Sequence, residues 1–401
     1  MRSCARPCFL PAIRKNCCDT FFLFCVYICK GGIVMKRLTR IIMLLLVLSL
    51  LAACTDQPRK EPQIEAVYDS VMYRLDLPES SSYELAGNGR NAVMLPFSNN
   101  GDNGDANVHG GTAIYHMYLE GETAKGTLVR ELEKPAELLG MDGTDGIWLY
   151  DGSLRRIDLN GTETLAIELP YPLWQNGVFG FADDGDYTYF LCCFKNPDES
   201  QILVYDKAGD LVFSQELTEY CQDTAGFIPQ EEEWAEDLEG REDDFLMSLL
   251  FAEGPIDSVR LSQGRNGSPV VTIIRKSPID GERYCILCPI QEDFSIVPVM
   301  YYEVENESGI PYGVPMASPE DKYDLLSPQK DALYGISLDA GKLTALAGWT
   351  QLQSNPSWFD GWANSVGMGP DGRLWSLEYS KEEDGYGLRS IGPKSAQSAQ
   401  G

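Results

Sequence analysis

Beyond residue 66 the chain is a succession of short apolar and aromatic runs that are separated by Gly, Asp and Asn. The runs are too short for most helices, and many of them alternate between apolar and polar positions, which is the period of a strand. Amphipathic helical patterns are nearly absent. We therefore predict an all-β fold, with the clearest strands at 67–75, 92–97, 112–119, 187–191, 202–205, 270–274 and 283–289.

A unit recurs in which an Asp-Gly turn, or a near variant, precedes an aromatic strand and a second strand. The units begin at Asp145, Asp184, Asp331 and Asp371, and neighbouring members of the first and the last pair are about 40 residues apart, the period of a four-stranded propeller blade. We predict a β-propeller-like domain over 67–392, with blades of about 40 residues. A less regular stack of antiparallel sheets is the alternative.

Two segments depart from this pattern. Residues 229–251 are rich in acids and place apolar side chains near one face of a helix, so we predict an acidic helical insertion with a solvated face. The β pattern ends near residue 392, and 393–401 is a polar tail expected to be disordered. A closed ring completes its last blade, so either the strand at 67–75 supplies the missing edge or the chain is a fragment.

Residues 35–53 have the pattern of a lipoprotein signal peptide. Lys36, Arg37 and Arg40 precede an apolar run at 41–51, and small residues precede Cys54. We expect cleavage before Cys54, lipid (palmitate among the acyl groups) on its sulfur, and a location on the extracytoplasmic face of the cell membrane, with 54–66 as a tether.

Residues 1–34 do not fit a signal, which begins within a few residues of the N-terminus. Lys30-Gly31-Gly32 can be encoded by a ribosome-binding sequence at a suitable distance before Met35. We interpret 1–34 as a misannotated leader, and a genuine N-terminal extension is the alternative.

The chain is strongly acidic, with a formal net charge of −28. The part after residue 53 is more acidic still, because residues 1–53 contain eight Lys or Arg and a single acid. Such a surface repels phosphate backbones and anionic headgroups, so we expect no nucleic-acid partner and a membrane contact through lipid alone.

Cysteine usage points to buried thiols. Cys285 and Cys288 form a CxxC motif, but their segment is predicted to be a strand, in which residues three apart point to opposite faces. Only two histidines occur in the chain, so a zinc site lacks further ligands. We expect no metal and no cofactor, and one disulfide remains an alternative.

Motifs of catalysis are weak. The Gly-x-Ser-x-Gly elbow of serine hydrolases does not occur. Ser327-x-x-Lys330 fits a Ser-x-x-Lys motif, but the Lys-Thr-Gly and Ser-Asp-Asn motifs that accompany a catalytic serine of this type are missing. The glycine-rich stretch 87–92 precedes a strand rather than a helix, which excludes a dinucleotide fingerprint. Residues 100–107 are rich in oxygen ligands without EF-hand spacing, so a turn-rich loop is favoured over a calcium site.

One aromatic cluster has the composition of a sugar-stacking loop, with Trp349, Trp358, Phe359 and Trp362 among polar residues and glycines. We name Trp349, Trp358 and Trp362 as candidate ligand-stacking residues. Packing between blades is the favoured alternative, because aromatic side chains dominate such cores.

At 323–349 and 369–377 the chain resembles Gram-positive surface lipoproteins in which a β-propeller-like region precedes an extracellular solute-binding domain. The shared positions include Tyr323, Asp324, the Leu-Tyr-Gly run at 333–335 and Trp349. The resemblance implies a role in solute uptake beside a transporter permease. The solute-binding domain that would follow is absent from this sequence, and one interpretation is that the chain is the front of a longer gene.

Together these features predict a non-catalytic, lipid-anchored propeller that binds a small molecule, a carbohydrate or a protein partner. The first alternative is a cell-envelope glycoside hydrolase with paired carboxylates, which the sequence cannot single out among so many acids. The second is a structural propeller that only makes protein contacts.

Overall fold

The computed structural model describes residues 64–97, 110–169, 178–193, 200–217, 258–277, 282–304, 306–307, 310–311, 315–319, 322–354, 366–380 and 385–394. The predicted leader, the signal peptide, Cys54, the loop at 100–107 and the insertion at 229–251 lie outside these residues. Among the residues described, no helix has the length and apolar composition to span a bilayer.

The described strands form six four-stranded antiparallel sheets, which we number 1 to 6 along the chain. Sheets 1 and 2 share β5 and contain β2 (Ser82–Gly87), β3 (Ala92–Phe97), β4 (Gly111–Glu120), β5 (Thr123–Met141), β6 (Ile147–Tyr150), β7 (Leu154–Ile157) and β8 (Glu163–Ile167). Sheets 3 and 4 contain β9 (Val178–Asp183), β10 (Tyr187–Cys193), β11 (Ser200–Asp206), β12 (Leu211–Glu216), β13 (Ser258–Gln263), β14 (Pro269–Lys276), β15 (Arg283–Pro289) and β16 (Met300–Glu303).

Sheets 5 and 6 contain β19 (Met316–Ala317), β20 (Leu325–Pro328), β21 (Ala332–Ser337), β22 (Lys342–Gly348), β23 (Val366–Met368), β24 (Leu374–Ser380), β25 (Gly385–Pro393) and β1 (Tyr68–Asp76). Outside the six sheets are a short hairpin, a 3-10 turn and a one-turn helix: β17 (Asn306–Glu307), β18 (Ile310–Pro311), η1 (Arg265–Gly267) and α6 (Trp349–Leu352). The predicted hairpin of 270–274 and 283–289 is confirmed as β14 and β15.

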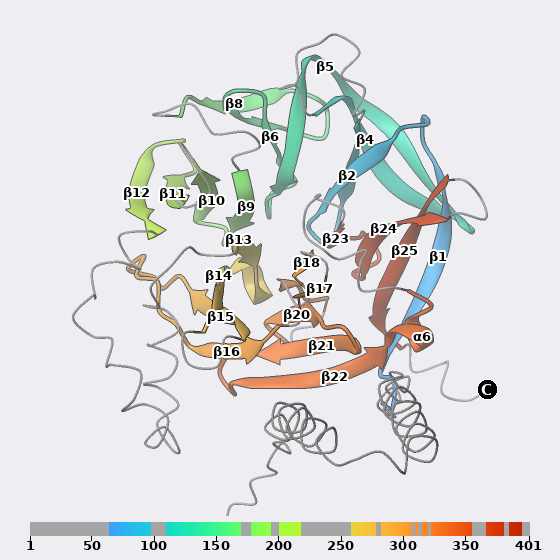
Figure 1. The fold of residues 1–401 in the computed structure, drawn as a ribbon. Coiled ribbons are helices and arrows are strands. Elements are labelled where there is room, and N and C mark those ends of the chain that lie inside the picture. The colour runs from blue at the N-terminus through green and yellow to red at the C-terminus, as the bar shows by residue number, and fades with distance from the viewer. Residues whose placement is uncertain are drawn as a thin grey trace, which may run out of the picture. The chain divides into compact units, whose positions relative to one another are not determined.

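The sheets follow one another around a common centre (Figure 1). Each sheet packs on the next through its own apolar cluster, because the side chains of a strand alternate between its two faces. One almost fully buried residue represents each of the six clusters: Leu138 between sheets 1 and 2, Phe190 between 2 and 3, Ile273 between 3 and 4, Ile336 between 4 and 5, Leu346 between 5 and 6, and Trp375 between 6 and 1. The predicted all-β, propeller-like fold is confirmed.

The N-terminal strand completes the last sheet. β1 pairs with β25 in antiparallel register from Tyr68 opposite Pro393 to Arg74 opposite Gly387. Tyr68 is buried in the cluster between sheets 5 and 6, and β1 lies beside β25 in Figure 1. Of the two alternatives for the incomplete last blade, the structure therefore shows the first, in which the strand near 67–75 supplies the missing edge.

One part of the predicted repeat is wrong. Asp145, Asp184 and Asp371 lie in the first hairpin turn of sheets 2, 3 and 6, between the innermost strand and the second. Asp331 instead lies in the second turn of sheet 5, between β20 and β21. Turn residues close any hairpin, so an Asp-rich turn alone does not say which hairpin of a sheet it closes.

Candidate functional site: the central channel and its first-turn rim

A channel runs along the innermost strands of the sheets, with a volume of about 420 Å³. All six innermost strands contribute lining residues: β2, the second half of β5, β9, β13, β19 and β23. The first hairpin turns of sheets 1 and 4 also line it, so this end of the channel opens among the first turns. The volume is in the range of small-ligand sites, about 300–1,000 Å³.

Glycine allows the innermost strands to approach one another. A Cβ on Gly180 of β9 would lie 2.5 Å from the carbonyl oxygen of Leu261 on β13. These two residues are also the parallel contact that joins sheets 3 and 4. A side chain at position 180 would force the two sheets apart, so this glycine sets the width of the channel there.

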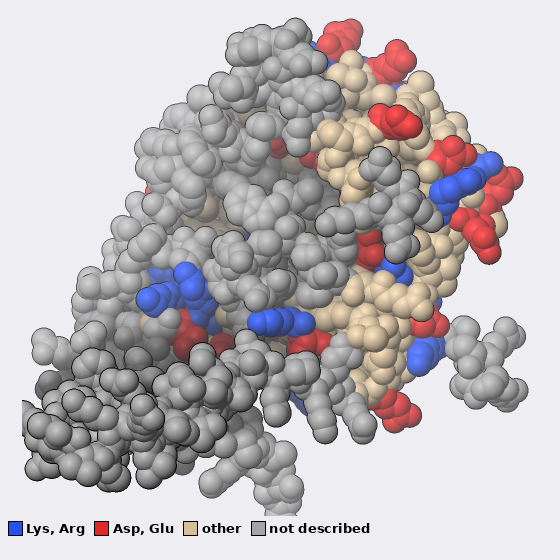
Figure 2. Space-filling model, turned by 45° about the vertical axis from the view of Figure 1, so that its right-hand side comes forward, with Lys and Arg blue, Asp and Glu red and all other residues tan. Residues whose placement is uncertain are grey.

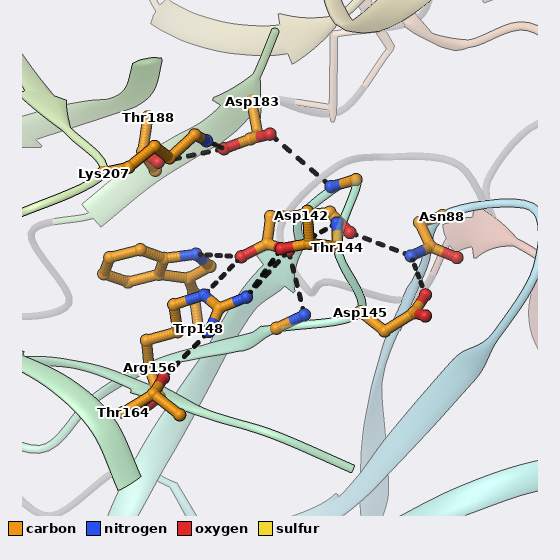
Figure 3. Close-up of polar contacts among 12 residues, drawn as sticks. Asn88, Asp142, Thr144, Asp145, Trp148, Arg156, Thr164, Asp183, Thr188 and Lys207 are labelled. Carbon is orange, nitrogen blue, oxygen red and sulfur yellow. Dashed lines mark hydrogen bonds and ion pairs between the residues drawn. The ribbon is translucent and has the colours of Figure 1, made fainter. Parts of the chain in front are cut away.

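The first turn of sheet 2 is organised by a buried aspartate, Asp142 (Figure 3). Its carboxylate accepts hydrogen bonds from the backbone N–H groups of Thr144, at 2.8 Å, and Gly146, at 2.9 Å. It also accepts from Trp148 Nε1 on β6, at 3.1 Å, and from Arg156 Nε on β7, at 2.6 Å. The carboxylate thus ties the turn to two strands of its sheet.

Burial alone would raise the pKa of Asp142, but the Arg156 guanidinium and the turn N–H groups outweigh it. They hold the pKa of this carboxyl at about 2. Hydrogen bonds to the charged form favour ionisation, as does a neighbouring cation. Asp142 is therefore a charged structural anchor, because the described partners of its carboxylate are donors of its own sheet.

Sheets 3 and 6 repeat the arrangement with other partners. Asp183 accepts from Gly185 N, Thr188 Oγ1 and Lys207 Nζ, at 3.2, 2.9 and 2.5 Å (Figure 3). In sheet 6, Asp371 accepts from Arg373 N, Trp375 Nε1 and Ser390 Oγ, at 3.1, 2.9 and 2.9 Å. In each sheet the aspartate joins the turn to the second residue of the following strand.

Asp142 and Asp183 are not part of the predicted repeat, which begins at the Asp-Gly pairs. In sheet 2 the anchoring Asp142 stands three residues before Asp145, the aspartate of the Asp-Gly pair. In sheet 3 the anchoring Asp183 stands one residue before Asp184. A signal was present: a hydrogen-bonding Trp or Thr stands at the second position of the strand that follows each turn.

Neighbouring first turns are linked to one another. Asn88 of sheet 1 donates through Nδ2 to the Asp142 carbonyl and to Asp145 Oδ1, both at 2.8 Å (Figure 3). Arg90 pairs with Asp145 at 3.3 Å. Gly143 N then approaches Asp183 Oδ1 at 3.5 Å, which leads from sheet 2 to sheet 3.

The links continue beyond sheet 3. A side chain on Gly267 of sheet 4 would lie 2.3 Å from the Asp183 carbonyl oxygen, so these two turns are in contact. Arg265 then joins sheet 4 to sheet 5, because its Nη2 lies 3.1 Å from Asp324 Oδ1. The result is a polar rim of first turns around the channel mouth.

Charge inside the channel differs from charge on the chain as a whole. Among the described residues that line it, the only charged side chains are Arg260 and Arg265. On the outer surface in Figure 2, acidic and basic side chains are interspersed. The described lining therefore contains basic but no acidic side chains, and one of the two arginines, Arg265, is paired with Asp324.

Two carboxyls with raised pKa values lie at the boundary of sheets 1 and 2. Burial raises the pKa of Glu84 to about 8, and the charge of Glu137 adds to this, although the Leu138 N–H group bonded to Glu84 opposes it. Burial also raises the pKa of Glu137 to about 7. Neither residue lines the channel, so the pair is not placed to act on a ligand there.

The predicted ligand-stacking residues are only partly described. Trp349 begins α6 and is buried in the cluster between sheets 5 and 6, where its Nε1 donates to the Gln329 carbonyl at 2.8 Å. Its ring is a packing element and not a surface platform. Trp358 and Trp362 lie outside the described residues.

The described cysteines behave as apolar side chains. Cys192, Cys285 and Cys288 are buried thiols. Cys285 packs between sheets 4 and 5 and Cys288 between sheets 3 and 4, which confirms the predicted opposite faces. In the described part of the chain, no group of three or more His, Cys, Asp or Glu side chains is arranged to hold a metal ion.

Ser327 and the stretch 87–92 have structural positions. Ser327 is buried in β20, with its hydroxyl 3.3 Å from that of Tyr302. Residues 87–92 form the turn between β2 and β3, where the Asn88 side chain accepts from the N–H groups of Arg90 and Asn91. Neither motif is placed for the chemistry that its letters resemble.

No family model and no curated protein matches this chain. Among solved structures it is similar to a quinonprotein alcohol dehydrogenase-like protein from Bacteroides thetaiotaomicron, with 13% identity and a TM-score of 0.34 over 78% of this chain. The chain spans 64% of the length of that protein. It is also similar to BamB from Moraxella catarrhalis, with 12% identity and a TM-score of 0.32, over 77% of this chain and 84% of that one. These likenesses are too distant to carry an argument about function.

Proposed function

We propose that this chain is a lipid-anchored, extracytoplasmic propeller that binds a small ligand in its central channel and serves solute uptake beside a transporter permease. The observation that carries the binding role is the channel itself, to which all six innermost strands contribute. The anchor and the compartment rest on the signal pattern at 35–53 and on Cys54. The link to a permease rests on the resemblance at 323–349 and 369–377.

Binding without turnover fits the residues around the channel. Its described lining contains no carboxylate, histidine or cysteine, so it offers no described side chain of the types that usually act as general base. The aspartates of the rim are already engaged by turn N–H groups and by side chains of their own sheets. We assign them to holding the mouth of the channel in shape.

The anchor is tested by fractionation of cells that express the full chain. The wild-type protein is expected in the membrane fraction and to incorporate an alkyne analogue of palmitate. Cys54→Ser should abolish the labelling and the membrane retention, whereas Cys192→Ser, which changes a buried thiol, should not. A wild-type protein in the soluble cell interior would refute the anchor.

The binding role is tested with a screen of neutral, anionic and cationic sugars and short peptides against the full chain in detergent. Ala317→Trp places an indole in the channel lining and should abolish any binding that the screen finds. The matched control is Leu211→Trp on the outermost strand of sheet 3, where Leu211 is 48% exposed. Equal binding by both variants would place the ligand outside the channel.

A further inference from the structure

A turn between β15 and β16 holds an aromatic residue, Phe294, in an unusual backbone conformation. Its φ is 65°, in the left-handed region that bulky side chains rarely adopt. The Phe294 N–H donates to the Gln291 carbonyl at 2.9 Å, and the Asp293 carboxylate accepts from the Ser295 N–H at 3.0 Å. Glycine or asparagine would adopt the same conformation with less strain. A phenylalanine here therefore indicates a role for its ring.

The Phe294 ring crosses from sheet 4 to sheet 3. It stacks on Phe213 of β12, with ring centroids 5.2 Å apart and an interplanar angle of 25°, and it meets Tyr187 of β10 edge-on, also at 5.2 Å. All three rings are half-buried against the cluster between sheets 3 and 4. Val297 and Val299, each 40% exposed, follow in the segment that leads to β16. These five residues together are called the apolar patch.

The apolar patch is separate from the proposed ligand site, because none of its five residues lines the channel. It nevertheless lies toward the same end of the propeller as the channel mouth. Strands of an antiparallel sheet alternate in direction, so the first and third turns of a sheet are at one end. Tyr187 follows the first turn of sheet 3, Phe213 follows the third, and Phe294 lies in the third turn of sheet 4.

Acidic side chains frame the apolar patch. They come from the three turns that carry its rings, at 184–186, 206–210 and 291–295. The acids of these turns are Asp184, Asp186, Asp206, Asp210, Glu292 and Asp293. The same turns contain a single base, Lys207, whose Nζ is paired with Asp183 at 2.5 Å (Figure 3). The border of the patch therefore has a net negative charge.

An apolar, aromatic centre with a charged border has the anatomy of a protein interface. Aromatic anchors provide most of the binding energy at such interfaces, and complementary charge selects the partner. Arg and Lys match both parts of this surface. Their alkyl stems cover apolar side chains while their charged ends reach carboxylates, and their cations are attracted to aromatic rings.

We propose that the apolar patch is a docking surface for a basic segment of a protein partner. Arg or Lys side chains of that segment lie against the rings of the patch and pair with the surrounding carboxylates. The inference is independent of the channel and its ligand, because the two sites share no described residue.

The test uses the full chain in detergent and two short peptides. In the first peptide Arg and Leu alternate, and in the second citrulline replaces each Arg, which removes the charge and keeps the shape. Fluorescence anisotropy at physiological ionic strength measures both affinities, because exposed charges far from the contact are largely screened there. The basic peptide is expected to bind at least tenfold more tightly than the citrulline peptide.

The place of binding is tested with matched variants. Asp210→Asn combined with Glu292→Gln neutralises two exposed acids of the border and should weaken the basic peptide at least tenfold. The control combines Glu131→Gln with Glu133→Gln, which removes two exposed acids of β5 and should weaken it less than twofold. Similar losses for the two double variants would mean that the peptide binds the acidic surface in general, and they would overturn the inference.

The role of the ring is tested with Phe294→Asn, because asparagine tolerates the left-handed turn. A loss of at least tenfold for the basic peptide is expected, and unchanged affinity would overturn the inference. If this variant does not melt cooperatively, a diazirine on the basic peptide takes its place and should label tryptic fragments that contain Phe213 or Phe294. Labelling confined to other fragments, equal affinity for the two peptides, or no binding by either would also overturn the inference.

Discussion

Replacement of Asp142 by alanine should cost much of the stability of the fold. The Asp142 side chain is 3% exposed and forms an ion pair with Arg156, whose side chain is 20% exposed. Removing one partner of a buried pair typically costs about 3–5 kcal/mol. The N–H groups of Gly146 and Trp148 would also lose their acceptor, but water can reach Arg156 and recover part of the loss, so we expect about 4 kcal/mol.

The assay is equilibrium urea denaturation, followed by circular dichroism and tryptophan fluorescence. Asp206→Ala is the matched control, because Asp206 also accepts two turn N–H groups, from Ala208 and Asp210 at 2.9 Å each, but it lies in an outer turn without a cation. Its loss should be about 1 kcal/mol. Equal losses for the two variants would refute the anchoring role of Asp142.

The pH dependence provides a second check on the same residue. The pKa of Asp142 is about 2 in the folded protein, below its ordinary value of 3.8. A lowered pKa stabilises the fold above pH 4, and this contribution, about 2 kcal/mol, is lost as the pH falls through 2. Asp142→Asn should lack this part of the acid-induced loss, and an unchanged acid profile would contradict the reasoning.

Three further predictions concern other parts of the fold. Glu84→Gln should raise the free energy of unfolding at pH 8, measured by urea denaturation. The raised pKa of Glu84 means that the folded protein binds more protons than the unfolded one, so wild-type stability falls as the pH rises from about 4.5 to 8. The same dependence of stability on pH in the variant as in the wild type would count against this. Tyr68→Ala should lower the free energy of unfolding by about 3–5 kcal/mol, because Tyr68 is 1% exposed in the strand that completes sheet 6. The control Val71→Ala, at a position 47% exposed, should lower it by less than about 0.5 kcal/mol. Similar losses for the two variants would argue against this role of β1. Burial raises the pKa of the Cys285 thiol to about 12, so it should resist iodoacetamide at pH 8 and react in urea, as peptide mass mapping would show, and rapid labelling of the native protein would refute its burial.

Much of the fold was readable from local pattern. The apolar runs at 187–191 and 270–274 predicted strands because the side-chain period of a strand is visible in any short segment. The same rule placed Cys285 and Cys288 on opposite faces, since three positions along a strand reverse the direction of the side chain. These properties depend on a few neighbouring residues.

The assignment of turns to places in the sheets was not readable in this way. Asp331 and Asp371 look alike in sequence, but one closes the second hairpin of its sheet and the other the first. β5 is one uninterrupted strand in the chain, yet its halves belong to two sheets. Both facts depend on which strands pair, and pairing partners are distant in sequence.

The sequence by itself determined the strand content, the acidic composition, the opposite faces of Cys285 and Cys288 and the lipoprotein pattern that ends at Cys54. Only the tertiary structure decided that β1 completes the last sheet, that Asp142, Asp183 and Asp371 anchor equivalent turns, and that the innermost strands line a channel. The reason is physical: strand period and composition are local, whereas a channel exists only where six strands from distant parts of the chain converge.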